Sequence, residues 1–139
     1  MTETPTQPDD PGDGSEIVEE YPHDCRIVLE ERERAADLYH YEGPLGRVKT
    51  FENSGKARLY ADVQGVVGGF REEKTGERGV PPAVARSRED VLMTYLAAQP
   101  TMSVAYVARA FDLPEERVRE YISVTRNRAS ERREEESND

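Results

Sequence analysis

Apolar residues in the C-terminal part of the chain recur at helical spacing. Between residues 87 and 124 they form three stripes with steps of one or three, and each stripe suits one face of a helix. Ser87 and Ser103 stand at cap positions, Gln99-Pro100 ends the first stripe, and Pro114 suits the first position of the third helix. The stripes are Val91, Leu92, Tyr95 and Leu96; Val104, Val107, Ala108 and Phe111; and Val118, Tyr121 and Ile122. The pattern predicts three helices, the last two joined by a tight turn at Asp112-Leu113.

A similar stripe covers residues 54–71, with apolar residues at Leu59, Tyr60, Val63, Val66, Val67 and Phe70. It predicts a helix capped by Ser54. Gly65, Gly68 and Gly69 each lower helix stability by up to ~1 kcal/mol relative to Ala, which suggests close packing against another helix. The segment "REEKTGERGVPP" (71–82) is polar, ends in a Pro pair and is expected to be a loop.

Residues 24–40 carry a weaker pattern. Asp24 suits an N-cap, and the apolar residues that follow favour a helix over the second half, while "CRIVL" alone is also compatible with a short strand. The next segment, "EGPLGRVKTFENSG", reads as a connection because of its Pro, Gly and Asn residues. Residues 1–22 are rich in Pro, Gly, Asp, Glu and Thr and are expected to be disordered.

These patterns together predict an all-α fold. Its expected parts are a disordered acidic tail (1–22), an N-terminal helical region (23–80), a helix-turn-helix domain (81–130) and a charged tail (131–139). With 139 residues, 35% of them hydrophobic, the core is expected to be modest.

The net charge of −10 is concentrated at the two ends of the chain. Residues 1–24 carry eight acids and no Lys or Arg, residues 25–114 carry thirteen acids and thirteen bases, and residues 115–139 carry eight acids and six arginines. The central part therefore need not repel nucleic acid. Sixteen of the nineteen bases are Arg, and this acidic, Lys-poor composition resembles that of proteins from salt-adapted archaea.

The segment "MSVAYVARAFDLPEERVREYI" resembles the helix-turn-helix of DNA-binding proteins, and is similar to the promoter-reading C-terminal region of sigma factors. Ala108 supplies the small residue at the helix crossing, and Asp112 stands where that family usually has a turn glycine. By this resemblance, the helix that starts at Pro114 enters the DNA major groove. Its expected outward-facing residues are Glu115, Glu116, Arg117, Arg119, Glu120, Ser123, Arg126 and Asn127, and those expected to bind DNA are Arg117, Arg119, Ser123, Arg126 and Asn127.

Within this set, Arg117 and Asn127 are of the type that reads base edges, and Arg119 and Arg126 suit phosphates. Glu116 can accept from a cytosine amine or complement the helix dipole. The expected partner is double-stranded DNA, with a possible homodimer through the N-terminal helices. The alternative is a non-enzymatic helical adaptor that binds another protein.

Other chemistry has little support in the sequence. His23, Cys25 and His40 are too sparse for a structural metal site, and no phosphate-binding loop or catalytic triad spacing occurs. We therefore expect no cofactor, no metal and no enzymatic activity. With no long apolar segment, no secretory signal pattern and one cysteine, the chain is expected to be cytoplasmic and to have no membrane partner.

Overall fold

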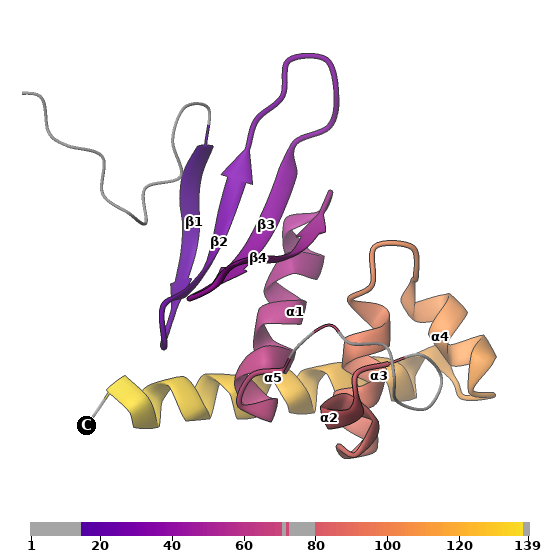
Figure 1. Cartoon of the computed structure of the whole chain (residues 1–139). Coiled ribbons are helices and arrows are strands. Elements are labelled where there is room, and N and C mark those ends of the chain that lie inside the picture. The colour runs from indigo at the N-terminus through magenta and orange to yellow at the C-terminus, as the bar shows by residue number, and fades with distance from the viewer. Residues whose placement is uncertain (1–14, 71, 73–79, 138–139) are drawn as a thin grey trace, which may run out of the picture. The chain divides into compact units, whose positions relative to one another are not determined.

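The computed structural model describes residues 15–70, 72 and 80–137, and the chain divides into two units (Figure 1). We call residues 1–52 the sheet unit and residues 53–139 the helical unit. The sheet unit contains β1 (Ser15–Tyr21), β2 (Cys25–Glu30), β3 (Leu38–Gly43) and β4 (Gly46–Phe51). The helical unit contains α1 (Ser54–Val67), α2 (Pro82–Ala85), α3 (Glu89–Ala97), α4 (Val104–Ala110) and α5 (Glu115–Ser137).

The four strands form an antiparallel sheet in the order β1-β2-β3-β4, so every strand pairs with its neighbour in sequence. Ile27 on β2 lies opposite Tyr41 on β3, and both side chains are buried. The β3–β4 hairpin closes through Pro44-Leu45, after which Gly46 adopts a φ of 117° that favours glycine. Leu45 at this turn is 99% exposed.

The expected all-α fold is therefore wrong, because the chain is mixed α/β with a four-stranded sheet. The error arose mainly over the second half of residues 24–40, where a helix was favoured, whereas the alternative of a short strand over "CRIVL" is confirmed by β2. Ile27 and Val28 belong to β2, and the helix-favouring segment 31–36 is the connection between β2 and β3. Pairing with neighbouring strands overrides the local preference of Glu, Arg and Ala for helix.

Two further segments of the sheet unit differ from expectation. Residues 15–21 form β1, although disorder was expected over 1–22; residues 1–14 lie outside the described part of the chain. The segment expected to be a connection contains the β3–β4 turn and β4. The segments "YHYEG" and "RVKTF" alternate and lie on either side of "PL", which is the pattern of a β-hairpin. This hairpin was not predicted, because the glycines were interpreted as loop residues.

The helix expected over 54–71 is present as α1 but ends at Val67. Its N-cap is Asn53 rather than Ser54, and the Asn53 side chain accepts a hydrogen bond from the Lys56 N–H at 3.0 Å. Gly68 is the left-handed C-cap, and its N–H donates to the Gln64 carbonyl. Close packing does not explain Gly65, because a Cβ there would meet no atom within 4 Å.

The three C-terminal helices are present where the apolar stripes predicted them. Ser103 caps α4 as expected, accepting from the Tyr106 N–H at 3.1 Å. Ser87 does not cap α3: the N-cap is Arg88, and the Ser87 hydroxyl donates to the Ala83 carbonyl. α5 continues to Ser137 and so includes most of the expected charged tail.

α5 packs along α1, α3 and α4, and its contact stripe includes the buried Val118, Thr125 and Ala129. A second cluster of the helical unit joins Tyr60, Phe70 and Tyr95, whose ring centroids lie 5.9–6.3 Å apart. The Glu72 carboxylate accepts hydrogen bonds from the Tyr60 hydroxyl at 2.7 Å and from the Tyr95 hydroxyl at 2.9 Å. No helix in the described part of the chain is long and apolar enough to cross a membrane.

Candidate nucleic-acid interface

α4, a four-residue turn and the start of α5 form the helix-turn-helix. Val107, Ala108 and Val118 are all at most 3% exposed, so the two helices meet through small and apolar side chains. The Leu113 N–H donates to the Ala108 carbonyl at 2.8 Å and closes the end of α4. Asp112 has a φ of 57°, which is the left-handed conformation. DNA-binding helix-turn-helix proteins usually have a glycine at this turn position.

All eight residues expected to face away from the core on α5 are exposed. The structure places the five expected DNA-binding residues on three sides of the helix. At 3.6 residues per turn, Ser123 and Asn127 lie opposite the buried stripe, with Arg117 on the flank that faces α3 and Arg119 and Arg126 on the flank that faces α1. The structure therefore does not gather the three arginines into one patch.

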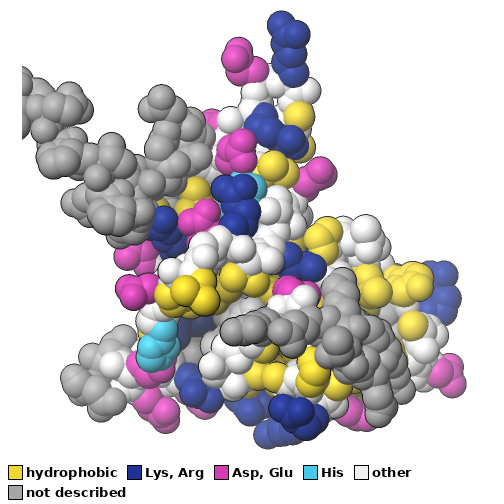
Figure 2. Space-filling view, viewed as in Figure 1, with side chains coloured by type: hydrophobic (Ala, Val, Ile, Leu, Met, Phe, Trp, Pro, Cys, Tyr) yellow, Lys and Arg dark blue, Asp and Glu magenta, His cyan; other side chains and the backbone are white. Residues whose placement is uncertain are grey.

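The outermost positions of α5 form a polar stripe that we call the outer stripe. It consists of Glu116, Glu120, Ser123, Asn127, Glu131 and Glu134, all exposed. Four of these six side chains are carboxylates, and none is basic. Basic side chains are found only on the two flanks of the helix. Lys and Arg are accordingly interspersed with Asp and Glu over the helical unit in Figure 2.

Every arginine of α5 already has an acceptor. Two of them pair with acids on α5 itself: Arg117 with Glu120 at 3.2 Å and Arg119 with Glu115 at 3.0 Å. These pairs are exposed, and such pairs contribute about 0.3–0.5 kcal/mol each on a helix. The other four reach towards α1 or α3: Arg126 and Arg133 to Asp62, Arg128 to Asp90, and Arg132 to the Val66 carbonyl.

On the α1 side, the carboxylate of Asp62 is 7% exposed and lies between two arginines. Arg133 Nη1 contacts Oδ1 at 2.9 Å, and Arg126 Nε contacts Oδ2 at 3.4 Å. Burial raises the pKa of Asp62, and the two guanidinium groups oppose this shift. We call Asp62, Arg126 and Arg133 the α1-side cluster.

On the α3 side, the carboxylate of Asp90 is 5% exposed and is held in the same way. Arg128 Nη1 contacts Oδ2 at 3.0 Å, and Arg88 Nε contacts Oδ1 at 3.4 Å. The Thr125 hydroxyl also donates to Oδ2, at 3.2 Å. We call Asp90, Arg88 and Arg128 the α3-side cluster. Close by, the Tyr121 hydroxyl donates to the Glu89 carboxylate at 2.9 Å.

Sequence reasoning missed Arg109, which is exposed on the last turn of α4, and Arg88, whose side chain is 69% exposed. Exposure of Arg109 follows from its position opposite the apolar stripe of α4, so helical spacing could have found it. No local pattern could have identified Arg88, because its place beside α5 depends on how α3 packs against α5.

The His and Cys residues lie in the sheet unit. His40 is 2% exposed: its Nδ1 lies 2.8 Å from the Thr50 hydroxyl and its Nε2 lies 2.7 Å from the Glu30 carboxylate. The Thr50 hydroxyl, the His40 imidazole and the Glu30 carboxylate stand in the order of a catalytic triad. Both ring nitrogens of His40, however, are used in hydrogen bonds that join β2, β3 and β4. Cys25 is half-buried, and its thiol donates to the His23 carbonyl. Within the described residues, no group of three or more His, Cys, Asp or Glu side chains could hold a metal ion.

Comparisons with known proteins gave no relative. No protein-family model matches the chain, and neither a curated protein nor a solved structure does. A function is therefore argued from the residues of this chain alone.

Proposed function

We propose that the protein binds double-stranded DNA through α4, the turn and α5, as a transcriptional regulator similar to the promoter-reading region of sigma factors. The observation that carries this proposal is the α4–α5 crossing, with Ala108 buried at the contact and Asp112 in the left-handed turn conformation. That crossing leaves one face of the first half of α5 exposed, as docking in a major groove requires. Such a role places the protein in the cytoplasm.

The proposed contacts are those of the exposed side chains of α5. Ser123 and Asn127 face outward and suit base edges, and Arg117 lies on the α3 flank near the start of the helix. Arg119 and Arg126 lie on the α1 flank and suit phosphates. Since Arg117 and Arg119 pair with Glu120 and Glu115, docking would exchange these exposed ion pairs for phosphates or bases.

A second candidate is a helical adaptor that binds another protein. It is favoured by the outer stripe, whose four carboxylates and lack of any base suit a basic protein surface. Tyr106 on α4, 54% exposed, and Val124 on α5, 41% exposed, would add apolar contact area. We rank this candidate second, because the helix-turn-helix crossing is the more specific feature.

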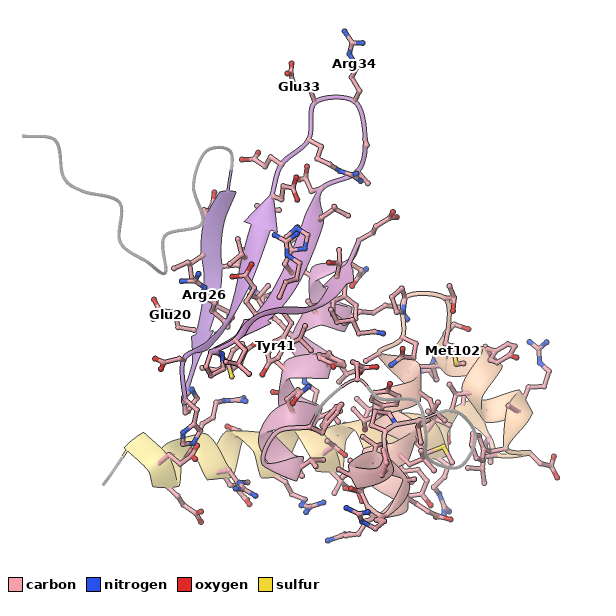
Figure 3. The ribbon with its side chains drawn as sticks, viewed as in Figure 1. Glu20, Arg26, Glu33, Arg34, Tyr41 and Met102 are labelled. Atoms are coloured by element: carbon pink, nitrogen blue, oxygen red, sulfur yellow. The ribbon has the colours of Figure 1, made fainter. Side chains whose placement is uncertain are left out.

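Fluorescence anisotropy with a pool of random duplexes, measured over a salt series, tests the proposal. Arg119→Ala should weaken binding about equally on all sequences and reduce the salt dependence by roughly one phosphate contact. Arg117→Ala should instead relax the preference at one base pair, by ~1–3 kcal/mol. The matched control is Arg34→Ala, an exposed arginine at the tip of the β2–β3 loop in the sheet unit (Figure 3).

Two outcomes decide between the candidates. DNA binding is supported if the affinity falls with salt in the wild type and the Arg34 variant, and is weaker and less salt-dependent in the Arg119 variant. If the wild type has no affinity for any duplex at low salt, DNA binding is rejected and the adaptor takes its place.

A further inference from the structure

The two sides of α5 carry matching arrangements of charge. In each, one buried aspartate from a neighbouring helix holds two arginines, one through Nη1 and one through Nε. The arginine held through Nε is the more exposed one, Arg126 at 58% on the α1 side and Arg88 at 69% on the α3 side. With two arginines and one aspartate, each cluster has a net charge of +1.

Holding an arginine through Nε leaves its outer nitrogens available. Within the described part of the chain, the Nη groups of Arg88 and Arg126 donate no hydrogen bond, and the ion pair of each arginine is made through Nε. A guanidinium presents its N–H donors in a fixed fork that matches phosphate oxygens. Each Nε atom lies 3.4 Å from an aspartate oxygen, so the ion pair favours orientations in which the outer edge of the guanidinium is turned away from the carboxylate, and this lowers the entropy lost on binding.

We infer that the α1-side and α3-side clusters are two phosphate-binding rails, one for each DNA strand, on either side of the outer stripe. This inference rests on the proposed function and changes its detail. It places the backbone contacts at the middle of α5 and at Arg88, rather than at the first two turns of α5. Arg88 was absent from the residues expected to bind DNA.

The dimensions of helix and groove agree with two rails. An α-helix with its side chains is about 10–12 Å across, and the major groove of B-DNA is about 12 Å wide. A helix inserted in the groove therefore meets bases with its outer stripe and phosphates with both flanks. On α5 the flanks carry the arginines, and the outer stripe carries Ser123, Asn127 and carboxylates, which can accept from cytosine amines.

The rails are tested with the full chain by changing the two exposed arginines. The variants are Arg88→Gln, Arg126→Gln and the double variant, with Arg88→Lys, Arg126→Lys and Arg34→Gln as controls. Anisotropy with the random duplex pool gives the slope of log K against log salt. Each Gln variant should lower the magnitude of that slope by about 0.9, and the double variant by about 1.8, because one phosphate contact is lost per arginine. The Lys variants and the Arg34 variant should keep the wild-type slope.

Stability measurements separate the rails from a purely structural role. Circular dichroism and urea unfolding of each variant show whether the fold is kept. If the Gln variants unfold more easily but keep the wild-type salt slope, the arginines only brace α5 and the rails are rejected. If those variants keep the slope while Arg119→Ala lowers it, DNA binding stands and docking occurs through the start of α5. If the wild type binds no duplex at all, the proposed function fails together with the rails.

Discussion

The Lys56 ammonium on α1 donates to the carbonyl of Ala97, the last residue of α3, at 2.9 Å. It also donates to the Gln99 carbonyl at 2.7 Å and to that of Met102, which lies in the α3–α4 connection (Figure 3). A helix C-terminus has unpaired carbonyls and a partial negative charge, so a cation placed there is stabilising. One side chain of α1 thus fixes both the end of α3 and the approach to α4.

Lys56→Met should therefore destabilise the helical unit. Three carbonyls would lose a charged donor, and hydrogen bonds to charged groups are worth about 1.5–3 kcal/mol. Urea unfolding followed by circular dichroism measures the change in unfolding free energy. Arg109→Met, an exposed cation on α4, is the control and should stay within about 0.5 kcal/mol of the wild type. Equal stability of the two variants would mean that Lys56 does not support the end of α3.

Ala108→Leu should destabilise the α4–α5 crossing. Ala108 is 3% exposed, and added volume at a close contact forces the helices apart at a cost of ~1–3 kcal/mol. Ala110→Leu on the same helix is the matched control, because Ala110 is exposed and its side chain has room. A melting temperature that falls as much for the control as for Ala108→Leu would contradict the assigned crossing.

Asp112→Gly and Asp112→Val should differ in their effect on the free energy of unfolding. With a φ of 57°, Asp112 occupies a region that glycine adopts freely and that β-branched residues avoid. The Gly variant should stay within about 1 kcal/mol of the wild type, and the Val variant should lose roughly 1–3 kcal/mol. Thermal unfolding of both variants is the measurement. A Val variant as stable as the Gly variant would show that the turn does not need the left-handed conformation.

The Asp62 carboxyl should make the effect of losing Arg133 depend on pH. Arg133→Met removes one partner of a buried carboxylate and should cost up to about 3 kcal/mol at neutral pH. Burial raises the pKa of Asp62 in the folded state, so protonation favours the folded state as the pH falls through that pKa. The deficit of the Arg133 variant relative to the wild type should shrink on acidification. Unfolding at several pH values tests this, and a deficit that stays constant or grows would refute it.

The pKa of Glu30 is lowered, whereas that of Asp62 is raised. Its hydrogen bond to His40, and then the charges of His40 and the nearby arginines, hold the pKa of Glu30 below its ordinary value of 4.5. A lowered carboxyl pKa means that the stabilisation is present above 4.5 and is lost as the pH falls through the folded-state pKa. In an NMR titration, the pKa of Glu30 should rise in His40→Phe and stay low in Thr50→Val, which keeps the contact between Nε2 and Glu30. The same pKa in both variants would exclude His40 as the cause.

Local signals were sufficient to predict the C-terminal helices. The apolar stripes, the cap at Ser103 and the tolerance of Asp112 for the left-handed conformation are all properties of short segments. The β2–β3 pair was not predictable in the same way, because these strands are joined by a segment with strong helix preference and are stabilised by pairing with their neighbours in the sheet. The mistaken cap at Ser87 has a different cause, since the Ser87 hydroxyl donates to the Ala83 carbonyl of α2.

The candidate interface was likewise predictable only in part. Helical spacing identified the exposed residues of α5, including Ser123 and Asn127. It could not identify which acids hold Arg126 and Arg128, because Asp62 and Asp90 lie on helices that are distant in sequence. Such pairings depend on tertiary packing, which a single sequence does not encode in any local pattern.

The order of the strands has a consequence for how the chain folds. Each strand pairs only with its neighbour in sequence, so the sheet can form by closing successive hairpins, each with a short loop and a small entropic cost. α1, by contrast, needs the far end of the chain, because Asp62 and Val66 contact arginines between positions 126 and 133. During synthesis on the ribosome, all four strands emerge before α5 is made. The sheet unit is thus set to fold co-translationally, and the helical unit only after α5 has been made.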